Sequence, residues 1–154
     1  RLPLTPVALD LKALLGDCLQ QVADAARYRK ITFEAALEGA PAVTGDEKMV
    51  RRAVVNLLWN ALKVSPPGAA GGLRGARADG RVRIAISDQG QAIPAEDRDK
   101  VLDQRFQAEA SRKNRPLGIG YGLIYCRLVA ESHGGALTVE AADKGNRFVL
   151  SLPL

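Results

Sequence analysis

The sequence has few aromatic residues, few cysteines and no long hydrophobic run. Aromatic residues make up 5% of its 154 residues, and we find neither a signal peptide nor an apolar stretch that could span a bilayer. No basic segment is interleaved with aromatic residues, which argues against a nucleic-acid partner. The two cysteines, Cys18 and Cys126, lie on apolar faces of expected helices. We interpret them as reduced core thiols of a cytoplasmic protein, and not as a disulfide or a metal pair.

The remaining composition is that of an ordinary globular domain. Hydrophobic residues make up 47% and charged residues 25%, with a net charge of +5. This charge suits a nucleic acid, an anionic membrane or a polyphosphate ligand, and by itself it selects none of them. The length fits one domain spanning residues 1–154. The chain begins at Arg1 without a methionine, so we expect a fragment of a longer protein whose membrane anchor, if it has one, lies elsewhere.

One helix, expected over residues 46–65 with Asp46 as its N-cap, organises the chain. Its apolar residues repeat at the spacing of a buried stripe, whereas Asn56, Asn60 and Lys63 fall along the flank. Two interpretations of the asparagines are open. They bond to neighbouring backbone or water, or their amide oxygens bind Mg²⁺ while the lysine contacts a phosphate.

The other elements follow from hydrophobic periodicity. We expect strands at 7–9, 31–37, near Val43, at 81–88, 136–141 and 147–152, helices at 11–29 and from 118 onward, and short helical turns in 95–103. This order lacks the regular alternation of a doubly wound parallel sheet. It predicts an α+β fold, a two-layer sandwich in which three helices cover one face of a mixed sheet.

Two segments break these patterns. Residues 66–80 are rich in glycine, alanine and proline, and we interpret them as a flexible loop. Residues 104–117 are polar and basic around a lone Phe106, which suggests a mobile segment.

A carboxylate at the end of the clearest strand is unusual. In residues 81–88, Asp88 shares the core-facing side with one valine and two isoleucines. A carboxylate in that position needs a partner. Further along, Gly118, Gly120 and Gly122 open a helix, where backbone N–H groups can approach an anion. The spacing matches neither a P-loop nor a dinucleotide fingerprint.

Taken in order, these motifs resemble the ATP-binding domain of sensor histidine kinases, within the GHKL superfamily of the Bergerat fold, which also holds gyrase and Hsp90-type chaperones. NLLWNALKVS is similar to the N box, SDQGQAIP to the first glycine box and QRFQ to the F box. GIGYGLIYCRLVAESHGG is similar to the second glycine box and the helix after it. The resemblance extends from about residue 8 to the end of the chain.

The resemblance implies roles for particular residues. Asn56, Asn60 and Lys63 are the expected catalytic residues, with Asn60 on Mg²⁺, Lys63 on phosphate and Asp88 accepting from the adenine amino group. Residues 104–117 form the ATP lid. The full set of implied ATP-binding residues is Asn56, Asn60, Lys63, Asp88, Gly90, Ala92, Ile93, Phe106, Gly118, Gly120, Tyr121, Gly122 and Leu123.

The resemblance also implies the reaction and its partners. Hydrolysing relatives carry glutamate at the place of Asn56, so we expect phosphoryl transfer to a protein histidine. His133 is interpreted as structural, with the phosphoacceptor on an upstream dimerisation domain of a homodimeric parent, and with a response regulator as the next partner. Ala92 stands where a second glycine is usual. This departure keeps an alternative open, a degenerate regulatory or protein-interaction module without kinase activity.

Overall fold

The computed structural model describes residues 2–37, 42–103 and 122–154, and these form a two-layer α/β sandwich. The elements in chain order are β1 (Val7–Asp10), α1 (Leu11–Tyr28), β2 (Thr32–Leu37), β3 (Ala42–Gly45), α2 (Glu47–Val64), β4 (Ala70–Ala78), β5 (Arg81–Ser87), the 3₁₀ turns η1 (Ala95–Asp97) and η2 (Lys100–Leu102), α4 (Gly122–Ser132), β6 (Ala136–Ala141) and β7 (Asn146–Pro153).

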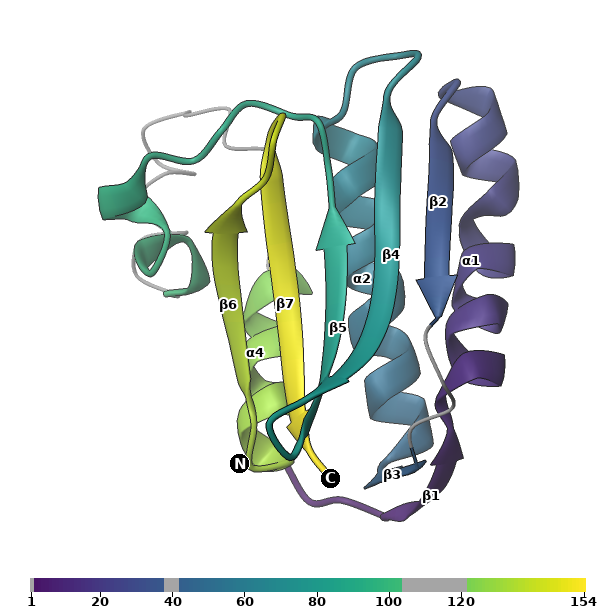
Figure 1. Ribbon diagram of the computed structural model, residues 1–154, viewed down its shortest axis with the longest axis vertical. Coiled ribbons are helices and arrows are strands. Elements are labelled where there is room, and N and C mark those ends of the chain that lie inside the picture. Colours follow the sequence, from purple (N-terminus) through teal and green to yellow (C-terminus); the bar gives the residue numbers. More distant parts are fainter. Residues whose placement is uncertain (1, 38–41, 104–121) are drawn as a thin grey trace.

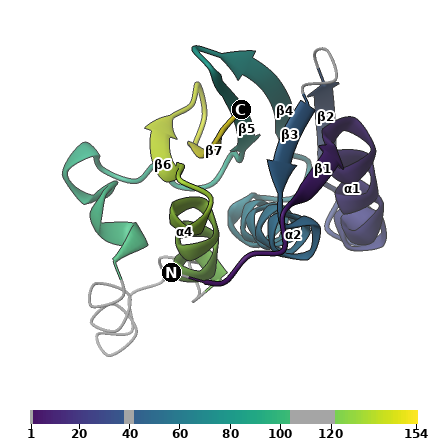
Figure 2. The same cartoon turned by 90° about the horizontal axis from the view of Figure 1, so that it is seen from below.

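The main sheet is mixed and has five strands in the order β2-β4-β5-β7-β6. Only the β2–β4 pairing is parallel. Helices α1, α2 and α4 lie together on one face of this sheet, with α2 in the middle (Figure 2). Strands β1 and β3 form a separate antiparallel pair near the start of α1. The predicted α+β sandwich with three helices on one face is therefore confirmed.

The interpretation of residues 66–80 as a loop was wrong, because Ala70–Ala78 form β4 between β2 and β5. The strand needs its glycines. A Cβ on Gly71 would lie 2.7 Å from the Phe33 ring, and one on Gly75 would lie 3.1 Å from Leu15. Asp79 and Gly80 both have positive φ, as in the two-residue turns that join antiparallel strands. The Asp-Gly pair was the sequence signal for this hairpin.

Both cysteines are buried and free, as the sequence suggested. The Cys126 thiol contacts the Ala53 carbonyl at 3.2 Å, and burial raises its pKa to about 12. Burial likewise raises the pKa of the Cys18 thiol to about 11. The neutral thiols pack as small apolar groups between helices, Cys18 of α1 and Cys126 of α4 each against α2.

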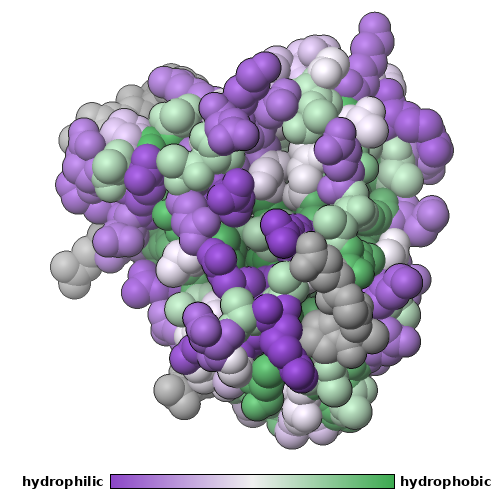
Figure 3. All heavy atoms as spheres, in the orientation of Figure 1, coloured by the Kyte–Doolittle hydropathy of each residue, from purple (hydrophilic) through white to green (hydrophobic). Residues whose placement is uncertain are grey.

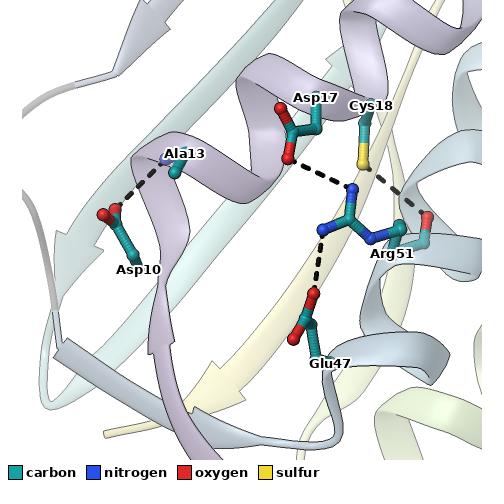
Figure 4. Close-up of polar contacts among 6 residues, drawn as sticks. All are labelled: Asp10, Ala13, Asp17, Cys18, Glu47 and Arg51. Atoms are coloured by element: carbon teal, nitrogen blue, oxygen red, sulfur yellow. Dashed lines mark hydrogen bonds and ion pairs between the residues drawn. The ribbon is translucent and has the colours of Figure 1, made fainter.

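A cluster of charged residues joins α1 to α2 at the surface (Figure 4). The Arg51 guanidinium lies 2.9 Å from Glu47 and 3.4 Å from Asp17, and the Cys18 thiol points to the Arg51 carbonyl. Because the carboxylates are more than half exposed, each pair contributes at most about 1 kcal/mol. The cluster therefore contributes little to the packing of α1 on α2, which buried apolar residues of both helices provide.

No helix of the described residues covers the other face of the main sheet, and Figure 3 shows hydrophilic residues spread across it. Arg83 and Arg147 from β5 and β7 both pair with Glu140 on β6. Among the helices in the described ranges, none combines the length and hydrophobicity that a membrane span requires.

Asp46 joins three parts of the fold at the start of α2. One carboxylate oxygen caps the helix by accepting from the Met49 N–H at 3.1 Å, and the other accepts from the Thr5 N–H at 2.8 Å. The Asp46 N–H donates to His133 Nε2 at 2.9 Å, and His133 Nδ1 lies 2.8 Å from the Val129 carbonyl. His133 therefore has the structural role that the sequence suggested.

These bonds make a prediction about acid stability. The N–H groups of Thr5 and Met49 lower the pKa of the Asp46 carboxyl, so folding favours its ionised form. We expect Asp46→Ala to lower the free energy of unfolding by about 2 kcal/mol at pH 7. The part of this stabilisation that depends on the ionised carboxylate is fully present at pH values above the ordinary aspartate pKa. It is lost as the pH falls through the lowered pKa of Asp46 in the folded protein.

Urea unfolding of both proteins at pH 7 and at pH 2–3 measures this difference. The matched control is Asp10→Ala, which removes the cap of α1. Within the described residues the Asp10 side chain accepts from Ala13 alone. A difference between wild type and Asp46→Ala that stays constant down to the lowest pH contradicts the assignment.

Candidate functional site

The site is built around Asp88, which follows the last residue of β5. Its side chain is 2% exposed. Oδ1 accepts hydrogen bonds from the Gly90 N–H at 2.9 Å and from the Asn146 backbone and side-chain amides at 3.3 Å each. Oδ2 is buried and has no hydrogen-bond partner within the described part of the chain. Burial raises the pKa of the Asp88 carboxyl, and the bonds from Gly90 and Asn146 oppose that shift.

A buried carboxylate oxygen without a hydrogen-bond partner is costly, and a ligand that donates to Asp88 Oδ2 would offset this cost. Leaving such an acceptor without a hydrogen bond costs about 1–3 kcal/mol, and more when the group is charged. The amino group of a purine or a similar neutral donor satisfies it without bringing a second charge into the site. The sequence correctly identified Asp88 as a core-facing carboxylate.

The loop after Asp88 packs against the C-terminal end of α2. A Cβ on Gly90 would lie 2.8 Å from both Val64 Cγ2 and the Val64 carbonyl oxygen. The Gln89 N–H donates to the Ser65 hydroxyl at 3.1 Å. Only glycine fits at position 90 with this backbone, and the contact brings the predicted adenine loop beside the helix that carries the asparagines.

Asn56 and Asn60 lie one turn apart in the second half of α2, both half-buried. Within the described residues neither side-chain amide forms a hydrogen bond. Lys63 follows in the last turn and is exposed. The choice between the two interpretations of these asparagines stays a prediction, because the described residues provide no hydrogen-bond partner for either side-chain amide.

The first turn of α4 completes the described part of the site. A Cβ on Gly122 would lie 3.6 Å from the Asn56 side chain, an ordinary contact distance. Leu123 is buried beneath it at 2% exposed. The start of α4 therefore adjoins the asparagine-bearing side of α2, in agreement with the close approach of the two helices in Figure 2. The remaining predicted residues, Phe106, Gly118, Gly120 and Tyr121, and the predicted lid 104–117 lie outside the described residues.

Ala92 does not strain the loop. Its φ lies outside the left-handed region, and its side chain is exposed. The backbone here therefore does not require the glycine that usually stands at this place. Ile93, next to it, packs against the core, and its N–H donates to the Asn146 side chain at 2.8 Å.

Sequence reasoning missed Asn146. Asn146 falls between the strands predicted at 136–141 and 147–152 and received no role, yet it is 4% exposed and its side chain bonds to Asp88, Gln91 and Ile93. Its partners lie more than fifty residues away, so no local pattern identifies it.

The donor set fits a magnesium nucleotide. Mg²⁺ prefers hard oxygen ligands and is usually held by few protein groups together with substrate phosphates and water. The amide oxygens of Asn56 and Asn60, which lie on one helix face and have no hydrogen-bond partner within the described residues, are ligands of that kind. In the described ranges no group of three or more histidine, cysteine or acidic side chains could hold a metal ion by itself.

Known proteins agree with this geometry. The model of the family described as histidine kinase-, DNA gyrase B-, and HSP90-like ATPase matches residues 45–154. The sensor histidine kinase CusS of Escherichia coli O157:H7 is 35% identical over 111 residues, covering 72% of this chain and 23% of CusS. The chain thus spans about a quarter of this relative's length.

Solved structures extend the likeness to nearly the whole chain. The mycobacterial sensor histidine kinase MprB has a TM-score of 0.80 and 34% identity, covering 98% of this chain and 97% of that one. The complex of the histidine kinase ThkA with the response regulator TrrA has a TM-score of 0.81, covering 97% of this chain and 42% of that one. At 20% identity, it shows the fold alone. The match to residues 45–154 and the likeness to MprB establish that the chain belongs to the histidine kinase-, DNA gyrase B- and HSP90-like ATPase family, as a domain of the sensor histidine kinase type.

Proposed function

We propose that this chain is the catalytic domain of a two-component sensor histidine kinase, which binds Mg-ATP and transfers the γ-phosphoryl group to a histidine on a separate dimerisation domain. The observation that carries the proposal is the buried, unpartnered Oδ2 of Asp88. The adenine amino group donates to it, and guanine, with a carbonyl at the same ring position, offers no such donor.

The phosphate end of the site lies on α2. Asn60 holds Mg²⁺ through its amide oxygen, Asn56 assists from the preceding turn and Lys63 contacts phosphate. Bound Mg²⁺ supplies charge neutralisation for the phosphoryl group in transfer. The protein contributes orientation and electrostatic stabilisation, which account for most of the catalysis of phosphoryl transfer.

Asn56 supports transfer over hydrolysis. A carboxamide cannot accept a proton from an attacking water, so position 56 lacks a general base. A neutral histidine acceptor attacks through its unprotonated ring nitrogen, so the attack requires no base at position 56, and the proton on the other ring nitrogen is released after the transfer.

The acceptor is a histidine outside these 154 residues. His133 is the only histidine in the sequence, and both of its ring nitrogens are engaged, with the Val129 carbonyl and the Asp46 N–H. In the proposed arrangement a response regulator receives the phosphoryl group next, and the parent is a homodimer in which this domain faces the cytoplasm.

A labelling experiment on the full parent chain tests this function. With ATP labelled at the γ-phosphate and Mg²⁺, we expect incorporation that survives alkali and is lost in acid, as for phosphohistidine. Labelling should stop when Mg²⁺ is chelated. A parent chain that binds ATP but never acquires acid-labile phosphate favours the regulatory module over the kinase.

A further inference from the structure

Asn146 holds the Asp88 loop from the opposite strand. It is the first residue of β7, pairs with Ala141 at the end of β6 and is 4% exposed. Its carbonyl accepts from the Asp88 N–H at 2.9 Å, which fixes the backbone where β5 ends.

The Asn146 amide is fully committed to this loop. Nδ2 donates to Asp88 Oδ1 at 3.3 Å and to the Gln91 carbonyl at 2.9 Å, and Oδ1 accepts from the Ile93 N–H at 2.8 Å. The Gln91 carbonyl needs a donor and the Ile93 N–H needs an acceptor, so the positions of Nδ2 and Oδ1 in the Asn146 amide are fixed. Both Nδ2 hydrogens are used, and none remains for a ligand.

The residue before it brings the two strands into close contact. Gly145 has a φ of +103°, and a Cβ there would lie 2.4 Å from the Asp88 carbonyl oxygen. The turn between β6 and β7 therefore approaches Asp88 more closely than any residue with a side chain permits.

These bonds decide which carboxylate oxygen faces the ligand. Asn146 supplies two of the three hydrogen bonds to Asp88 Oδ1, and Gly90 supplies the third. With Oδ1 saturated, Oδ2 is the oxygen left to accept. Within the described residues no ionisable side chain bonds or pairs with Asp88, so these amides are its polar surroundings.

We infer that Asn146 is a positioning residue for purine recognition, which orients Asp88 and fixes residues 89–93 through its side-chain amide. The inference rests on the proposed function only in naming the purine. The effect on the Asp88 carboxyl itself is independent of any nucleotide.

The first test uses the nucleotide-free domain. Carbon NMR of the Asp88 carboxyl gives its titration midpoint in the wild type, Asn146→Ala and Asn146→Asp. We expect a higher midpoint in both variants, because each removes a hydrogen bond that favours the ionised form, and Asn146→Asp adds a like charge. Ser151→Ala on the same strand, whose side chain makes no hydrogen bond within the described residues, is the control and should leave the midpoint unchanged.

The second test measures binding of Mg-ATP and Mg-GTP against pH. Asn146→Asp should weaken ATP binding about tenfold at neutral pH and reduce the preference for ATP over GTP. On acidification, its affinity for ATP should fall at a higher pH than that of the wild type. A variant that is merely less stable would show a lower unfolding temperature and a smaller fraction of binding-competent protein. The pH at which its ATP affinity falls would stay that of the wild type.

The outcomes separate the two proposals. An unchanged Asp88 midpoint in Asn146→Ala overturns the inference, whether or not ATP binds. A raised midpoint in a domain that never binds ATP supports the positioning role and contradicts the proposed function.

Discussion

An Asp88→Asn variant is expected to fold at least as stably as the wild type and to lose about 100-fold in affinity for ATP. Burial raises the pKa of the Asp88 carboxyl, so the folded chain holds that proton more tightly than the unfolded chain. Its stability therefore decreases as pH rises through the interval between the two pKa values, and at neutral pH the ionised carboxylate is a cost. Asparagine removes that cost.

The same replacement puts a hydrogen-bond donor where the ligand's amino group needs an acceptor. The carboxamide that Asp88→Asn introduces can still accept from Gly90 and Asn146 through its oxygen, but it presents an N–H₂ group where Oδ2 stood. Two donors then face each other in place of a charge-assisted hydrogen bond of about 1.5–3 kcal/mol. Calorimetric titration with ATP and thermal unfolding measure both effects, with Asp99→Asn at an exposed site as the control. Affinity preserved within threefold would show that Asp88 does not bind the base.

Replacing Asn60 should have the largest effect on phosphoryl transfer. We expect Asn60→Ala in the parent chain to reduce the rate roughly 100-fold or more, because the ligand that places the metal on the phosphates is lost. Folding stability should change by less than about 0.5 kcal/mol, since the amide is half-buried and makes no hydrogen bond within the described residues.

A nucleotide titration with and without Mg²⁺ assigns this loss to the metal. In the wild type, Mg²⁺ should strengthen ATP binding. In Asn60→Ala that gain should disappear while metal-free binding is unchanged, and Asn60→Asp, which keeps an oxygen ligand, should retain it. An equal loss with and without metal would mean that Asn60 contacts the nucleotide directly.

Much of this site could be predicted because its residues contradict their local pattern. Asp88 follows β5 on its core-facing side, and Asn56 and Asn60 stand in a helix whose other side is lined by buried apolar residues. A polar group in such a place is costly, so the sequence alone showed that something must compensate it. Asp46 was equally clear as a helix cap, because capping is a local interaction within three residues.

What could not be predicted depends on contacts between distant segments. In β4 the inward positions are partly glycine, because Phe33 and Leu15 occupy the space that side chains would fill, so the usual alternation is missing. Asn146 looks like any turn asparagine until the sheet brings it to Asp88, 58 residues away. Such roles exist only in the folded chain.

The measurement that tests the central claim most directly is calorimetric titration of the purified domain with Mg-ATP and with Mg-GTP. The account predicts that ATP binds at least tenfold more tightly than GTP, because adenine presents its C6 amino group to Asp88 Oδ2, where guanine would present a carbonyl oxygen. Equal affinity for the two nucleotides, or no binding of either at millimolar concentration, would contradict it.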